Sequence, residues 1–190
     1  MTNHFFDVGA NTGQTFGAYL SQLPEYNGWT VWCFEPSPRH FTALLNESKA
    51  FSDRYKIKVC PFGLADKTAA CTIFEKTDPQ GDSLSETLTM GYGIVPNEHH
   101  GYDVMATVYS AADFILSHTA PDDRIVLKLN CEGAEFPIIR NLLTSREALK
   151  RCSLLLVAWH MTEPNSEAHR LTAELLSAGA NIKQWMGQPE

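Results

Sequence analysis

Residues 4–15 read HFFDVGANTGQT, and this stretch decides the expected fold. Its apolar first half predicts a buried strand. Gly9 and Gly13 bracket a tight loop where the backbone must turn sharply and a ligand could approach closely, because glycine has no Cβ. Between them, Asn11 is the non-glycine type that best tolerates a left-handed conformation. Apolar residues then recur at helical spacing, so the stretch predicts a strand, a glycine turn and a helix that together can bind a nucleoside-bearing ligand.

The bulk properties of the chain fit one globular domain over residues 1–190, with 44% hydrophobic residues. A net charge of −7 argues against broad binding to nucleic acid or to anionic membranes, which needs a basic surface. Five cysteines without a CxxC pair indicate reduced thiols, and the four tryptophans, Trp185 among them, are expected to be core or interface aromatics. No signal peptide and no membrane-length apolar run are evident, so we expect a cytoplasmic protein.

Strand-like runs alternate with helical patterns along the chain. Core strands are expected over residues 4–8, 30–34, 57–62, 125–130 and 154–159, with a final edge strand over 181–185. Helices are expected after Gly13, after the cap Ser37-Pro38, over 110–117, around 136–143 and over 166–177. This rhythm implies right-handed parallel crossovers and therefore a doubly wound, mostly parallel α/β sheet.

Residues 67–123 break the rhythm. Two short strand-like runs, 70–74 and 102–108, predict a small β insertion between the third and fourth core strands. Residues 77–101 between them are polar and rich in turn residues, and a stretch of this length is more often a lid or binding loop than filler. Residues 63–66, which precede the insertion, are expected to form a turn.

One acidic residue has the spacing of a ribose-binding acid. Glu35 ends the second strand, 22 residues after Gly13, where a carboxylate accepts hydrogen bonds from ribose hydroxyls in nucleoside-binding α/β folds. A solvated acid that caps the next helix is the alternative. The dinucleotide fingerprint G-x-G-x-x-G is absent, which leaves a nicotinamide-dependent oxidoreductase as a weak expectation.

Three stretches together resemble the FkbM-type methyltransferases: residues 6–13 (FDVGANTG), 34–38 (FEPSP) and 128–135 (KLNCEGAE). The first also resembles motif I of the class I S-adenosylmethionine (SAM) methyltransferases. The resemblance spans about residues 5–159 and implies a class I, Rossmann-like fold, SAM as cofactor and mostly O-methylation. The third family motif usually reads Lys-x-Asp-x-Glu-Gly, whereas this chain has Asn130 where the Asp is expected.

The resemblance also implies which residues bind the cofactor. Those around its methionine part would be Asp7, Gly9, Asn11, Thr12 and Gly13. An acid at the end of the first strand could meet the cofactor's ammonium. Those around its adenosine would be Glu35 at the ribose and Pro36, Gly63 and Leu64 at the adenine. Asn130 would lie beside the sulfonium and the acceptor.

A hydroxyl acceptor must lose its proton, so a base is expected near the site. His160 is the first candidate, because it follows the fifth strand at the ligand-binding edge and titrates near neutrality; a structural histidine is the alternative. Glu132 is the second, with an acid that holds the loop as its alternative. Asn130 is the third catalytic candidate. Lys128 lies inside an apolar strand and needs a partner, which Glu132 or Glu135 could supply.

These observations predict methyl transfer from SAM to a hydroxyl of a small molecule, sugar or glycan. A non-catalytic SAM- or nucleoside-binding partner or sensor subunit is the alternative, motivated by Asn130 and the few residues before the first strand. The acceptor pocket is expected to be built from residues 77–101 and 161–166. No metal site is predicted, since residues 98–100 (EHH) fit a solvated loop better. An unprotected edge strand could pair two copies into a homodimer.

Overall fold

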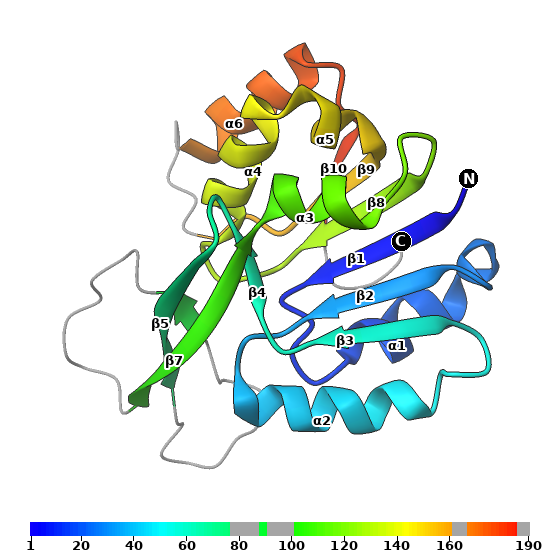
Figure 1. Ribbon diagram of the computed structural model, residues 1–190, viewed down its shortest axis with the longest axis vertical. Helices are drawn as coiled ribbons and strands as arrows, with labels where there is room; N and C mark the ends of the chain where they lie inside the picture. Colours follow the sequence, from blue (N-terminus) through cyan, green and yellow to red (C-terminus); the bar gives the residue numbers. More distant parts are fainter. Residues whose placement is uncertain (77–87, 91–100, 161–166, 186–190) are drawn as a thin grey trace.

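The larger of two sheets carries the first motif. We describe residues 1–76, 88–90, 101–160 and 167–185 of a computed structural model. Six parallel strands form this sheet in the order β10-β9-β8-β1-β2-β3 (Figure 1). The strands are β1 (Asn3–Val8), β2 (Thr30–Phe34), β3 (Lys56–Cys60), β8 (Arg124–Leu129), β9 (Cys152–Val157) and β10 (Ile182–Gln184). The predicted doubly wound, mostly parallel α/β sheet is confirmed.

The order of the strands locates the crevice of the fold. The chain runs outward from β1 to β3, returns to the middle of the sheet, and then runs from β8 to β10 on the other side. Strand β1 pairs with both β2 and β8, and its residues from His4 to Val8 are buried. A sheet that reverses direction in this way leaves a crevice beside the carboxyl ends of its two central strands, where open α/β sheets bind ligands.

Helices cover both faces of this sheet (Figure 1). One face carries α1 (Gln14–Ala18), α2 (Pro38–Lys49) and the 3-10 turns η1 (Leu20–Gln22) and η2 (Pro24–Tyr26). The other carries α3 (Ala111–His118), α4 (Glu135–Thr144), α5 (Arg146–Arg151) and α6 (Glu167–Ser177). Alternate β1 side chains enter the two cores, Phe5 on the α1 side and Phe6 on the α3 side. Within the described part of the chain, every helix is too short or too polar to cross a bilayer.

The helix ends follow the sequence signals in most cases. Ser37 Oγ accepts a hydrogen bond from His40 N at the start of α2, and Pro38 is its first residue. Ser110 caps α3 through Asp113 N. Gly179, which follows α6, has the positive φ of 80° that ends many helices.

The helix after Gly13 is shorter than the apolar spacing predicts. It ends at Ala18, because Tyr19 leaves the helical conformation (φ −133°, ψ −69°) and Gly17 weakens the last turn. In this position the Tyr19 ring packs on Phe5 and on Trp185, with ring centroids 6.3 and 4.6 Å away. The sequence pattern also missed α5 entirely.

The second sheet is the predicted β insertion. Its strands β4 (Gly63–Ala65), β5 (Ala69–Lys76), β6 (Leu88–Met90) and β7 (Gly101–Ser110) pair in the order β4-β7-β5-β6. The predicted turn at residues 63–66 is wrong, because Leu64 and Ala65 are buried and pair in parallel with β7. Residues 77–87 and 91–100 of the expected substrate loop lie outside the described residues, as do 161–166.

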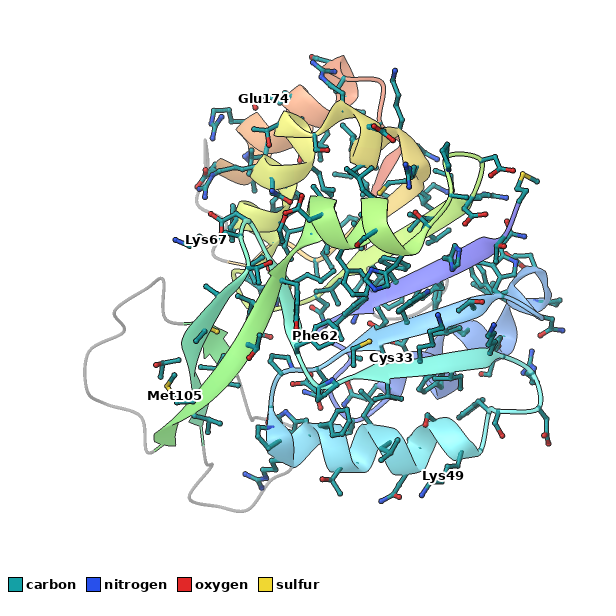
Figure 2. All side chains as sticks on the ribbon, viewed as in Figure 1. Cys33, Lys49, Phe62, Lys67, Met105 and Glu174 are labelled. Atoms are coloured by element: carbon teal, nitrogen blue, oxygen red, sulfur yellow. The ribbon has the colours of Figure 1, made fainter. Side chains whose placement is uncertain are left out.

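Two contacts fix the second sheet beside the carboxyl ends of the parallel strands (Figure 1). Phe62, labelled in Figure 2, lies between β3 and β4. Its ring packs on Tyr109 of β7 and Phe114 of α3. Asn141 of α4 donates from Nδ2 to Asp66 O (2.9 Å) and accepts at Oδ1 from Ala112 N (2.8 Å). The second sheet therefore borders the crevice of the first.

Candidate functional site

A pocket opens at the carboxyl ends of β1, β2 and β8. The structure brings together eight of the expected site residues along its wall: Gly9, Asn11, Glu35, Pro36, Gly63, Leu64, Asn130 and Glu132. Four others do not line it: Asp7, Thr12, Gly13 and His160. The sequence pattern missed several wall residues: Gln14, Thr15, Ala18, Ile73, Cys131 and Trp185.

The glycine loop allows close packing of the protein on itself. Gly9 has φ 74°, and a Cβ there would lie 2.1 Å from the backbone oxygen of Asn130. Gly13 has φ 93°, and a Cβ there would lie 2.9 Å from Glu47 Cγ. Asn11 takes the expected left-handed conformation (φ 49°). The two glycines are therefore required where the first loop meets the loop after β8 and helix α2, which is a different reason from the ligand approach that we expected.

Glu35 is held by the backbone on both sides. Its Oε2 accepts from Asn11 N and its Oε1 from Ser37 N, each at 2.8 Å. The side chain is 1% exposed, so it is not the solvated acid of the alternative interpretation. Burial raises the pKa of Glu35, although the two amide hydrogen bonds oppose the rise. A carboxylate oxygen can accept more than one hydrogen bond, so Glu35 keeps acceptor capacity toward the pocket.

Asp7 and Lys128 form a buried ion pair that corrects two expectations. They are direct neighbours in the register of β1 and β8, and Lys128 Nζ lies 2.6 Å from Asp7 Oδ1 and 3.0 Å from Gly9 O. The partner of Lys128 is therefore neither Glu132 nor Glu135, because register places Asp7 directly across from it. The Asp7 carboxylate is turned to this lysine, so the ammonium-binding role expected for Asp7 does not fit its position. Lys128, in contrast, lines the pocket.

A chain of three charged groups leads from the pocket wall into the protein. Glu132 lines the pocket, and its Oε1 lies 3.3 Å from His160 Nε2. His160 Nδ1 lies 3.0 Å from Oε1 of Glu135, a fully buried carboxylate. Glu135 also accepts from His160 N (2.8 Å) and Gly133 N (3.0 Å). Glu132 has φ 52°, a left-handed conformation that costs energy for this residue type and turns the loop at the pocket.

The charges of this group differ from those expected for a histidine base. Hydrogen bonds to Glu132 and then Glu135 raise the pKa of His160 to about 10, so the ring is an imidazolium at neutral pH. Burial alone would raise the pKa of Glu135, but the hydrogen bonds from His160 outweigh it and lower that pKa. An imidazolium has no free acceptor nitrogen. Of the two expected bases, Glu132 is therefore the one that faces the pocket as an acceptor.

The thiol of Cys131, which neighbours this group, is expected to be unreactive. Cys131 lies on the pocket wall, but burial and the nearby Glu135 raise its pKa well above the usual range. A thiol of this kind stays protonated and is a poor nucleophile. The five cysteines of the chain are all free, as the sequence predicts.

Comparison with known families identifies the family of this chain. A model of the methyltransferase FkbM domain matches residues 7–182. The chain belongs to the FkbM methyltransferase family. Searches of curated proteins and of solved structures each gave no match. The FkbM assignment confirms the resemblance carried by the three motifs, and it agrees with the Rossmann-like sheet and supports a methyltransferase role. The FkbM match ends three residues before Trp185, so this wall residue lies outside it.

Proposed function

We propose that this FkbM domain transfers a methyl group from SAM to a hydroxyl group of a small molecule, sugar or glycan. The observation that carries the proposal is that one pocket, at the switch point of the sheet, is lined both by Glu35, an acid held by backbone amides, and by a second acid, Glu132. The first suits a nucleoside and the second suits a hydroxyl that must lose a proton.

The residues present fit an adenosyl cofactor. Glu35 is fixed by two amides and keeps acceptor capacity, which suits the two ribose hydroxyls. Pro36, Gly63, Leu64 and Ile73 supply a largely apolar wall beside it, which suits an adenine ring. Asn11, whose backbone is in the left-handed conformation, lines the same pocket. These residues would hold the nucleoside part.

SAM, when bound, supplies an electrophilic methyl group on a positively charged sulfur. The protein's own contribution is then alignment of the acceptor and removal of its proton. We assign the proton to the Glu132 carboxylate. His160 holds that carboxylate in place through Nε2, and Glu135 holds the histidine through Nδ1 and the backbone N–H. His160 is therefore a positioning residue in this proposal.

Asn130 cannot have the chemical role of the acid that is usual at this position. It lines the pocket next to Glu132 and can donate and accept hydrogen bonds through its amide. An amide cannot take the acceptor's proton, so we assign Asn130 to orienting the acceptor hydroxyl toward the methyl group. Because Asn replaces the usual Asp at position 130, Glu132 is the carboxylate that we assign to the acceptor hydroxyl.

Binding is tested by titrating the protein with S-adenosylhomocysteine in a calorimeter. We expect binding by the wild type and at least a tenfold weaker affinity for Glu35→Gln, since one carboxylate oxygen is replaced by an NH₂ donor. Folding of both proteins is checked by circular dichroism. Failure of the folded wild type to bind S-adenosylhomocysteine or SAM at millimolar concentration rejects the proposal.

Catalysis is tested by transfer of a labelled methyl group from SAM to a panel of sugars and small hydroxylated compounds. Glu132→Gln should lower kcat by about 100-fold or more, as loss of a general base does, while the affinity for S-adenosylhomocysteine changes by less than about twofold. Cofactor binding without a methylated product across the panel would favour the alternative of a nucleoside-binding sensor or partner subunit.

A further inference from the structure

Trp185 is a lining residue of the pocket that follows the last strand of the sheet. It directly follows β10, and its N–H donates to Val157 O at 2.9 Å, which places it at the carboxyl edge of the sheet. Its ring packs edge-on against Tyr19, with centroids 4.6 Å apart, and lines the pocket. Strand β10 thus forms an edge of the sheet, and the residue after it supplies part of the pocket wall. The expectation of a core or interface aromatic missed this role.

Lys128 lies on the wall beside this ring. Its Nζ is 5.8 Å from the centre of the Trp185 ring. An ammonium has three N–H donors. Among the described residues, the ammonium of Lys128 has two hydrogen-bond acceptors, Asp7 Oδ1 and Gly9 O. One donor therefore stays available to a ligand in the pocket that this side chain lines.

The strand order separates this end of the pocket from the nucleoside end. Glu35 follows β2, whereas Trp185 follows β10, and β9, β8 and β1 lie between these two strands. If the ribose of a nucleoside ligand lies at Glu35, the substituent on that ribose therefore points toward Lys128 and Trp185. The Asp7–Lys128 pair has no net charge, so this end suits a zwitterion better than a phosphate chain.

We propose that Trp185 and Lys128 form the subsite for the aminoacyl end of the cofactor. This inference rests on the proposed function. The remaining N–H of Lys128 donates to the carboxylate of the aminoacyl group. The face of Trp185 covers the aliphatic chain and the ammonium, for which an aromatic ring is a favourable neighbour. Trp185 is in this way a specificity-determining residue that favours nucleosides with an aminoacyl group.

The test compares two ligands that differ in that group. S-adenosylhomocysteine carries the aminoacyl end, and 5′-methylthioadenosine lacks it. Both are titrated calorimetrically into the wild type, Trp185→Ala, Trp185→Phe and the control Gln184→Ala, which changes an exposed residue of the same strand outside the pocket. We expect Trp185→Ala to weaken S-adenosylhomocysteine about tenfold and 5′-methylthioadenosine by less than about twofold. Trp185→Phe should lie between, and Gln184→Ala should match the wild type.

The outcomes separate this inference from the proposed function. A wild type that binds both ligands, with Trp185→Ala weakening both equally or neither, overturns the subsite while the methyltransferase proposal stands. A wild type that binds neither ligand rejects both. Because 5′-methylthioadenosine reports an intact nucleoside end, unchanged binding of this ligand also shows that Trp185→Ala is folded.

Discussion

Two buried glutamates at the same edge of the sheet have opposite electrostatics. Glu35 follows β2 and Glu135 begins α4; they are 1% and 0% exposed, and each accepts two backbone hydrogen bonds. Burial raises the pKa of Glu35, whereas the pKa of Glu135 is lowered. The difference is His160, whose imidazolium hydrogen-bonds to Glu135; at Glu35, two amides and the charges of His40 and Lys128 oppose the rise of the pKa but do not outweigh burial.

The comparison shows what backbone amides can and cannot do for a buried carboxylate. Two N–H groups hold the geometry of Glu35, but they do not fully replace the water that its charge has lost. At Glu135, the imidazolium of His160 compensates for the lost water. Glu35, for which burial outweighs the amides and the nearby charges, is the one that faces the pocket, where a ligand's hydroxyls can complete its hydrogen bonds. Glu135, in contact with the imidazolium, is structural.

The largest expected effect is on stability. Glu135→Gln leaves the imidazolium and one N–H without a full partner, so it should lower the free energy of unfolding by about 3 kcal/mol. Glu35→Gln should cost only about 1 kcal/mol, because loss of a hydrogen bond is offset by removal of a poorly solvated charge. Urea unfolding at pH 7 measures both. The comparison fails if Glu35→Gln is the more destabilising change.

The next effect concerns alkaline pH. The folded pKa of His160, about 10, lies above the ordinary 6.5, so its stabilising contribution is complete below pH 6.5 and is lost as pH rises toward 10. We expect wild-type stability to exceed that of His160→Gln by about 2 kcal/mol at pH 7, a typical value for hydrogen bonds to charged groups, and the difference to vanish near pH 10.5. Urea unfolding of both proteins at pH 6, 8 and 10.5 measures it. A difference that is independent of pH would show that the ring is neutral.

The smallest effect separates the Glu35 hydrogen bonds from the helix cap beside them. Ser37 donates its backbone N–H to Glu35 and accepts from His40 N with its hydroxyl. Ser37→Ala keeps the first bond and loses the second, so it should cost about 1 kcal/mol of stability. The affinity for S-adenosylhomocysteine should change by less than about twofold. A larger loss of affinity would mean that the hydroxyl, and not the carboxylate alone, prepares the nucleoside end.

The sequence predicts the parts of this molecule that depend on local pattern. The apolar runs locate β1, β2, β8 and β9, and the Ser37-Pro38 cap locates α2, because burial and capping act over a few residues. The motif spacing likewise places Glu35 and Asn130 on one pocket.

What the sequence could not predict depends on register and on distant strands. The pairing of Asp7 with Lys128 follows from which residues lie opposite one another on β1 and β8, and no local signal encodes that alignment. Trp185 reaches the pocket only because β10 lies parallel to β9 and ends at the same edge. The strand β4 looked like a turn because its partner, β7, lies more than 30 residues away.

The contact between Gly9 and Asn130 has a consequence for protein engineering. The atom that would meet a Cβ at position 9 is the main-chain oxygen of residue 130, so the fit of the two loops is independent of the side chain there. Position 130 is therefore a site where polar side chains of similar size can be exchanged while the scaffold stays the same. Asn130→Asp, which restores the acid usual in the family, is the natural first step in retuning the acceptor side of the pocket.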